Sequence, residues 1–209
     1  MRVVEPSFTI LTDVDEASVA RRIERAGRVC YKSEERITER SAPAFVRRII
    51  KSGHESVIEH EVISALVTCD RGVSHEWVRH RIASYSQEST RYCNYGQDKF
   101  GGEVTFIKPC FWDEDSEPYR LWAESMRAAE TAYFKLLESG ATPQQARGVL
   151  PNSLKTEFVV TMNLREWRHF FIMRTDKAAH PQMREVACAM LARFQELLPC
   201  IFDDIAITN

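Results

Sequence analysis

Apolar residues recur mainly at helical spacing along this chain. Val19, Ile23 and Ala26 share one face of a helix that we expect over residues 13–28, with an acidic residue at its cap. A second helix is expected from Ser41 to Gly53, because a hydroxyl residue and an early proline favour a helix start and glycine favours a helix end. Both segments therefore present an apolar stripe to a core.

The rest of the chain alternates further helices with a few strands. Residues 61–69 are strand-like, although their apolar alternation is imperfect, and residues 103–107 and 156–162 also favour strands. Helices are expected over residues 115–138, from residue 142, over residues 164–173 and over residues 181–198. Interleaved helices with few strands predict an α+β fold.

Composition limits the size of the protein and the class of its partners. The 209 residues suit one large domain, or two small ones that share an interface. An apolar content of 44% and eleven phenylalanines indicate a substantial core. The formal charge of −2 argues against a general nucleic-acid partner, because such proteins are usually strongly basic. Any anion site must therefore be a local concentration of arginine.

Cysteine usage and the lack of long apolar runs indicate a compartment. The six cysteines are scattered without a Cys-x-x-Cys pair, which is typical of reduced cytosolic thiols rather than a disulfide frame or a zinc ribbon. The first residues lack the apolar core of a signal peptide, and no apolar run approaches the length that spans a bilayer. We expect a soluble, cytoplasmic protein without a membrane partner.

The segment from Arg79 to Tyr92 concentrates candidate chemistry. It contains Arg79-His80-Arg81, then seven residues, then Ser89, with Arg91 close behind. Guanidinium groups bind phosphate through paired, charge-assisted hydrogen bonds, and hydroxyl groups add neutral ones. The segment therefore suits a ligand that bears phosphate, although a solvated basic loop would have the same composition.

Ser89 itself has two possible functions. A nucleophilic serine needs a base within hydrogen-bond reach and a third group that orients the base. His80 is the one candidate base nearby in the sequence, and no neighbouring motif orients it. Phosphate or pyrimidine binding is therefore the interpretation that we prefer for Ser89.

Two histidine-containing segments could suggest a metal site. His54 and His60 are six residues apart, which places them about 120° from alignment on a helix. His75 and His80 are five residues apart, whereas the zinc-binding motif that they resemble needs a spacing of four. We therefore predict no metal at either segment.

A third motif lies near the C-terminus, in Asn163-x-Arg165-x-x-x-His169-x-x-x-x-Arg174. On an ideal helix Arg165 and His169 lie about 40° apart, so that one ligand could contact both. Arg174 lies about 180° from Arg165, which suits a different ligand or a turn. From the residues alone, Arg165 and His169 could equally be a solvated helix face.

No Gly-x-Gly-x-x-Gly motif follows a strand, which argues against a Rossmann flavin site.

The Arg79–Arg91 segment resembles the signature of the flavin-dependent thymidylate synthases, in which Arg-His-Arg is followed seven residues later by Ser. The elements Ala146-Arg147-Gly148-Val149-Leu150-Pro151 and Asn163 to Arg174 resemble later blocks of the same family. The resemblance implies a single domain over residues 1–209. Its fold would be α+β, a small mostly antiparallel sheet packed by several long helices, assembled as a homotetramer with active sites shared between subunits.

The resemblance also implies a set of site residues. Those expected to contact FAD are His54, Ser56, Glu59, Arg79, His80, Arg81, Asn163, Arg165 and His169. Those expected to bind dUMP are Glu76, Arg79, Gln87, Glu88, Ser89, Thr90, Arg91, Arg147 and Arg174, with Arg174 as the catalytic residue that activates the pyrimidine electrostatically. Glu76 and Gln87 depart from the common family pattern, which has glutamine and glutamate at these places.

The implied reaction is the reductive methylation of dUMP to dTMP. Methylenetetrahydrofolate would supply the carbon, and NADPH would reduce FAD, which supplies the hydride.

Two other classes of protein remain open from the residues alone. One is a non-catalytic nucleotide- or RNA-binding protein that uses the same arginines, although Tyr85, Tyr92 and Tyr95 are the only candidate stacking residues. The other is a zinc hydrolase, which the histidine spacing disfavours.

Overall fold

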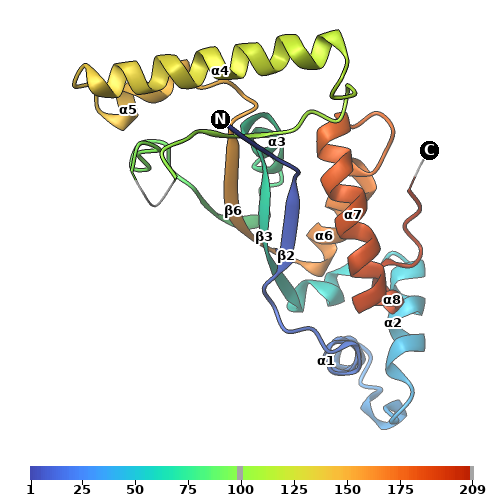
Figure 1. Ribbon diagram of the computed structural model, residues 1–209. Helices are drawn as coiled ribbons and strands as arrows, with labels where there is room; N and C mark the ends of the chain where they lie inside the picture. Colours follow the sequence, from blue (N-terminus) through green and yellow to red (C-terminus); the bar gives the residue numbers. More distant parts are fainter. Residues whose placement is uncertain (98–100, 208–209) are drawn as a thin grey trace. The chain divides into compact units, whose positions relative to one another are not determined.

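The computed structural model describes residues 1–97 and 101–207, and its helices outnumber its strands (Figure 1). The described elements are β1 (Arg2–Val4), β2 (Ser7–Ile10), α1 (Glu16–Val29), η1 (Glu34–Arg36), α2 (Ala42–Lys51), η2 (Glu55–His60), β3 (Val62–Asp70), α3 (Arg71–Trp77), β4 (Ala83–Gln87), β5 (Thr105–Ile107), α4 (Glu117–Glu138), α5 (Pro143–Ala146), η4 (Arg147–Val149), β6 (Lys155–Asn163), α6 (Leu164–Arg174), α7 (Pro181–Leu197) and α8 (Pro199–Phe202). This confirms the α+β prediction.

The expected helices and the three expected strands are present to within a few residues. Helix α1 begins at the cap Asp15, whose carboxylate accepts from the backbone N–H of Ser18. Ser41 precedes α2 as predicted, but its hydroxyl donates to Glu24 instead of capping the helix. Pro199 follows α7 and also opens α8. The predictions missed the short elements β1, β2, α3 and β4, because three to seven residues carry too little periodicity.

Four strands form a small sheet in the order β2-β3-β6-β4. The pairing of β3 with β6 is antiparallel: the N–H of Leu164 donates to the carbonyl of Glu61, and the hydroxyls of Ser64 and Thr161 hydrogen-bond at 2.7 Å. Strands β1 and β5 form a separate parallel pair. The sheet is therefore small and antiparallel, as predicted.

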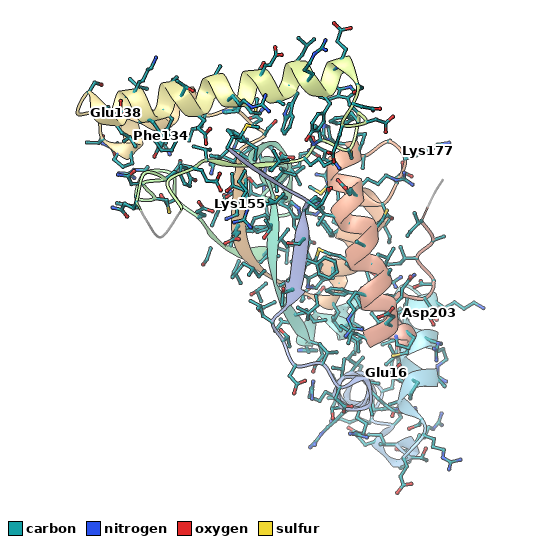
Figure 2. The ribbon with its side chains drawn as sticks, viewed as in Figure 1. Glu16, Phe134, Glu138, Lys155, Lys177 and Asp203 are labelled. Carbon is teal, nitrogen blue, oxygen red and sulfur yellow. The ribbon has the colours of Figure 1, made fainter. Side chains whose placement is uncertain are left out.

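The chain forms two compact units. The first comprises residues 1–8, 66–79 and 85–159 and has its own core. Tyr133 from the long helix α4 and Phe106 from β5 are fully buried in that core. Phe134 on α4 is partly buried against the same cluster (Figure 2). The amphipathic α4 thus covers this core with one face.

The second unit comprises residues 9–65, 80–84 and those from 160 onward. Helices α1 and α2 pack closely there because Gly27 has no side chain: a Cβ atom at this position would lie 2.6 Å from the ring of Phe45. An aromatic cluster fills the core around α6, α7 and α8. Its fully buried members are Trp167, Phe170, Phe171, Phe194 and Phe202.

Two other sequence predictions concern the whole chain. No helix in the described ranges is both long and apolar enough to span a membrane. All six cysteines are free thiols, so none forms a disulfide. The assignment of residues 1–209 to a single domain stays a prediction.

Replacing Phe171 by alanine should destabilise the protein by about 3–5 kcal/mol, the usual cost of deleting a buried phenyl ring. Its ring contacts Trp167, Phe194 and Phe202 at centroid distances of 5.0–5.8 Å. Urea unfolding would measure the change. The control is Ile172→Ala at the exposed neighbouring position, which should alter stability by no more than about 0.5 kcal/mol. Equal losses in both variants would contradict this packing.

Candidate functional site

Helix α6 orients several of the candidate residues in the second unit. Its N-cap is Asn163, whose side-chain oxygen accepts from the backbone N–H of Glu166 at 2.9 Å. Trp167 and Phe170 are fully buried, whereas Arg165 and His169 are exposed. Burial of the aromatic face therefore directs Arg165 and His169 outward on the same side of the helix.

These two residues line a cavity of about 490 Å³, which we call the α6 cavity. Its lining consists of Glu55, Glu59, Ile82, Asn163, Arg165, Glu166, His169 and Ile172. Arg165 donates to Glu59 across it, and this hydrogen bond raises the pKa of the arginine above its ordinary value. The cavity thus combines paired charges with an exposed imidazole.

A larger cavity of about 790 Å³, which we call the arginine cavity, lies in the same unit and shares Glu55 and Arg165 with the α6 cavity. His54 and Ser56 line it from the turn before and within η2. Residues expected to contact flavin are therefore brought together around the two adjoining cavities. They are His54, Ser56, Glu59, Asn163, Arg165 and His169.

Three further arginines line the arginine cavity: Arg28, Arg36 and Arg48. Arg28 is ion-paired with the buried carboxylate of Glu24 at 2.8 Å, and its guanidinium lies over the Phe45 ring. The sequence prediction missed all three because they come from α1, η1 and α2, outside any motif. Together with Arg165 they give the cavity an excess of positive charge, which suits phosphate groups.

His80 has a fixed position in the second unit. Its side chain is 4% exposed, and its Nε2 accepts a hydrogen bond of 3.0 Å from Arg174 Nε. Glu166 Oε1 lies 3.3 Å from its Nδ1, and the rings of His169 and Phe170 flank it. Burial, with the nearby Arg174 and His169, lowers the pKa of His80 to about 4. The imidazole is therefore neutral at pH 7.

A cluster with metal-ligating potential was not anticipated from the sequence. Ligand atoms of His80, Glu166 and His169 lie within 4.8 Å of one another, the one such group of three or more in the described ranges. However, both ring nitrogens of His80 already face other groups, and the charge of Arg174 lies beside them. This geometry suits hydrogen bonding better than cation binding.

A second cluster, in the first unit, contains most of the residues expected to bind the nucleotide. Glu88 accepts from the hydroxyl of Tyr95 at 2.9 Å and from Lys155 at 3.2 Å. Burial raises the pKa of the Tyr95 hydroxyl well above its ordinary value, so that Tyr95 remains a donor. Gln87 donates through its amide to Ser74 and Thr156. The side chains of Glu88 and of Gln87, one of the two positions that depart from the family pattern, are therefore held by hydrogen bonds.

In the same cluster, hydroxyl groups and positively charged side chains lie around residues 89–91. Arg147 donates to the Thr90 hydroxyl at 3.1 Å, although these residues are 57 positions apart. Ser89 Oγ accepts from the backbone N–H of Arg91. Glu76, which is half-buried, and the exposed Arg79 also belong to this unit.

The predicted residues are divided between the units. The Arg-His-Arg motif itself changes unit after Arg79, since His80 and Arg81 belong to the second unit. Arg81 is exposed, and Arg174 is in the second unit with His80. The expected nucleotide set is therefore distributed over both units.

Residues 14–200 match the family model described as thymidylate synthase complementing protein. A protein of Pyrococcus abyssi named flavin-dependent thymidylate synthase is 39% identical over 174 residues, which cover 81% of this chain and 70% of that protein. The chain belongs to the flavin-dependent thymidylate synthases. A Mycolicibacterium gilvum protein of the same name is 36% identical and covers 97% of this chain and 85% of its own length.

A solved structure agrees with the fold of this flavin-dependent thymidylate synthase. The crystal structure of the UMP/dUMP methylase PolB from Streptomyces cacaoi, bound with 5-Br dUMP, superposes with a TM-score of 0.79. The match covers 97% of this chain and 96% of that one at 24% sequence identity. At this identity the likeness supports the fold.

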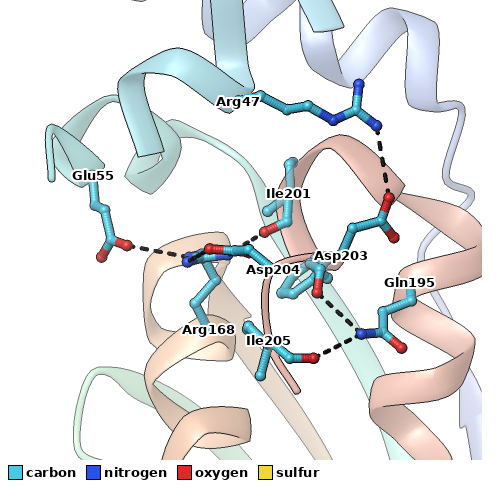
Figure 3. A network of polar contacts seen from close by, with 9 residues as sticks. Arg47, Glu55, Arg168, Gln195, Ile201, Asp203, Asp204 and Ile205 are labelled. Carbon is cyan, nitrogen blue, oxygen red and sulfur yellow. Dashed lines mark hydrogen bonds and ion pairs between the residues drawn. The ribbon is translucent and has the colours of Figure 1, made fainter. Parts of the chain in front are cut away.

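The C-terminal segment of the synthase is tied to the cavity wall through Arg168 (Figure 3). The buried guanidinium forms two hydrogen bonds with Asp204, at 2.6 and 2.7 Å, and donates to the carbonyl of Ile201. Its Nε donates to Glu55, which lines both cavities. The hydrogen bonds of Arg168 therefore connect the chain end to the η2 turn.

Asp204→Ala should lower the free energy of unfolding by about 1–3 kcal/mol, because it removes the bidentate partner of a buried guanidinium. Chemical denaturation would measure the loss. The matched control is Asp203→Ala, since Asp203 and Arg47 form an exposed pair at 3.7 Å that should contribute less than about 1 kcal/mol. A larger loss at Asp203 than at Asp204 would contradict the anchoring by Arg168.

Stability should also fall as the pH is lowered through the range where His80 titrates. The pKa of His80 is about 4 in the fold against 6.5 for the ordinary group, so the unfolded state binds more protons between these values. The His80 contribution to stability should therefore decrease by about 2 kcal/mol from pH 7 to pH 5.

Burial raises the pKa of Glu166, which acts in the opposite direction, because protonated Glu166 favours the fold at lower pH. Urea unfolding of the wild type and of His80→Gln at the two pH values isolates the histidine. The variant should show a smaller loss. An equal loss in both proteins would mean that His80 is not the titrating group.

Proposed function

We propose that this enzyme catalyses the reductive methylation of dUMP to dTMP, with FAD as cofactor and NADPH and methylenetetrahydrofolate as co-substrates. The observation that carries the proposal is the pair of adjoining cavities that share Arg165 and Glu55. They collect six of the residues that the family resemblance assigns to flavin. The relatives named flavin-dependent thymidylate synthase support the same chemistry.

The chemistry of the cavity lining fits FAD. The arginine cavity is within the range of roughly 300–1,000 Å³ that is usual for ligand pockets. Arg28, Arg36 and Arg48 would bind the pyrophosphate, and the exposed Arg165 and His169 would contact the rest of the cofactor. When bound, FAD supplies the hydride for the reduction. Arg79, His80 and Arg81 remain part of the proposed flavin site.

The nucleotide would be held by the hydroxyl and arginine cluster of the first unit together with Arg174. The phosphate would accept hydrogen bonds from the hydroxyl of Ser89 and from the guanidinium groups of Arg91 and Arg147. Glu76, Arg79, Gln87, Glu88 and Thr90 complete the proposed site. The crystallised PolB, named a UMP/dUMP methylase and bound with 5-Br dUMP, is consistent with this substrate class.

Arg174 would activate the pyrimidine electrostatically. A guanidinium group stays protonated in proteins, so that it cannot serve as an acid or a base. Placed near the uracil carbonyls, it would stabilise the negative charge that develops there in the transition state. The hydrogen bond with His80 would hold the Arg174 guanidinium in a defined orientation.

Several further features belong to the proposal. We propose a cytoplasmic homotetramer whose subunits share active sites, because scattered polar contacts to one cofactor often come from more than one chain. The partners would be small molecules: dUMP, folate and NADPH, with neither nucleic acid nor membrane.

Anaerobic dTMP formation tests the proposal. The reaction would contain dUMP, methylenetetrahydrofolate, NADPH and FAD, with controls that omit FAD or NADPH. Product that needs both is the expected result. A folded, flavin-loaded protein that makes no dTMP would refute the synthase activity and leave a flavin site of another function.

Arg174→Ala should lower kcat by at least about tenfold at saturating dUMP, because a charge that acts in the transition state is lost. Steady-state kinetics across a dUMP series would separate kcat from KM. Arg193→Ala, at an exposed arginine paired with Glu196 on α7, should behave as wild type. Normal turnover by Arg174→Ala would exclude the activating function.

A further inference from the structure

We propose that Glu166 and His80 are positioning residues for Arg174, with His80 held as the Nδ1–H tautomer so that Nε2 orients the guanidinium. We call the hydrogen-bonded set Glu166–His80–Arg174 the His80 bridge. The inference rests on the proposed function for its catalytic consequence, whereas the bridge itself is a property of the fold. It assigns a function to Glu166, which no sequence motif had indicated.

The tautomer follows from the donors and acceptors. Arginine can only donate, so the 3.0 Å contact of Arg174 Nε with His80 Nε2 requires a lone pair on that nitrogen. A neutral imidazole then carries its proton on Nδ1, where the Glu166 carboxylate lies at 3.3 Å and can accept it. The His80 imidazole therefore connects the Glu166 carboxylate, an acceptor at Nδ1, with the Arg174 guanidinium, a donor at Nε2.

Helix geometry explains why an intermediary is needed. Glu166 and Arg174 are both on α6, eight residues or about 12 Å apart along the helix axis, which is too far for easy direct contact. His80 comes from a different segment and is held between the rings of His169 and Phe170. The imidazole thus links the first turn of α6 to its last.

Burial makes the bridge selective for the neutral imidazole. His80 and Glu166 are 4% and 7% exposed, so little water is available to replace a lost partner. A protonated His80 would present N–H groups on both sides and would meet the Arg174 guanidinium donor to donor. The hydrogen bond between Arg174 Nε and His80 Nε2 would then be lost, and His80 would no longer orient the guanidinium.

The tautomer can be measured directly by NMR on protein labelled with ¹⁵N-histidine. The wild type at pH 7 should show one neutral imidazole with its proton on Nδ1, and this signal should be absent from His80→Gln. A His80 that is protonated, or neutral with its proton on Nε2, would overturn the proposal. This measurement needs no substrate, so it decides the bridge even if the protein forms no dTMP.

Kinetics test whether the bridge acts on Arg174. His80→Leu removes the acceptor, whereas His80→Gln can place an amide oxygen near the position of Nε2. We expect kcat at saturating dUMP to fall about tenfold or more in His80→Leu, the effect of losing one hydrogen bond to a charged group. His80→Gln should recover most of it. His60→Gln, at an exposed histidine that lines neither cavity, should behave as wild type.

Equal loss in His80→Leu and His80→Gln, or a change in KM alone, would overturn the positioning function. Glu166→Gln supplies an independent comparison, because its amide oxygen can still accept a hydrogen bond from Nδ1–H, so this variant should lose less activity than Glu166→Leu. If the leucine variants do not fold, the tautomer of His80 in the wild type still tests the His80 bridge. Absence of dTMP from the wild type itself would instead refute the proposed function.

Discussion

Burial of the aromatic face of α6 is the constraint on which the second unit depends. Trp167, Phe170 and Phe171 are fully buried, and Phe194 and Phe202 pack against them. A helix whose apolar face is fixed in this way has no freedom to rotate, so its polar residues have fixed directions too. Arg165 and His169 consequently face the cavities, and Glu166 reaches His80.

Buried charge is the second organising feature, and two buried arginines of the second unit have carboxylate partners. Arg28 pairs with Glu24, and Arg168 pairs with Asp204 and Glu55. Such pairs cost desolvation free energy, so their main effect is to fix geometry rather than to add stability. Arg168 illustrates this function, since it fixes Glu55 in the wall that both cavities share.

The long elements could be predicted from the sequence, because α1, α2, α4 and α7 each offer several turns of periodic apolar residues with recognisable ends. The short strand β4 could not, since its five residues lie within a basic and polar motif. Motifs identified Arg165 and His169, but Arg28, Arg36 and Arg48 meet only through the packing of separate elements. Glu166 was missed for the same reason: its importance comes from His80, which is 86 positions away in the sequence and in contact with it in the fold.

The central claim is that Arg165 and His169 on α6 contact the flavin in the two adjoining cavities, and that Arg174 on the same helix contacts the nucleotide. A crystal structure of the protein with FAD and dUMP bound tests it most directly. The expected electron density places FAD in contact with Arg165 and His169, with its phosphates among the arginines of the larger cavity, and places the Arg174 guanidinium against the pyrimidine. FAD bound without contact to Arg165 and His169, or a pyrimidine remote from Arg174, would contradict the claim.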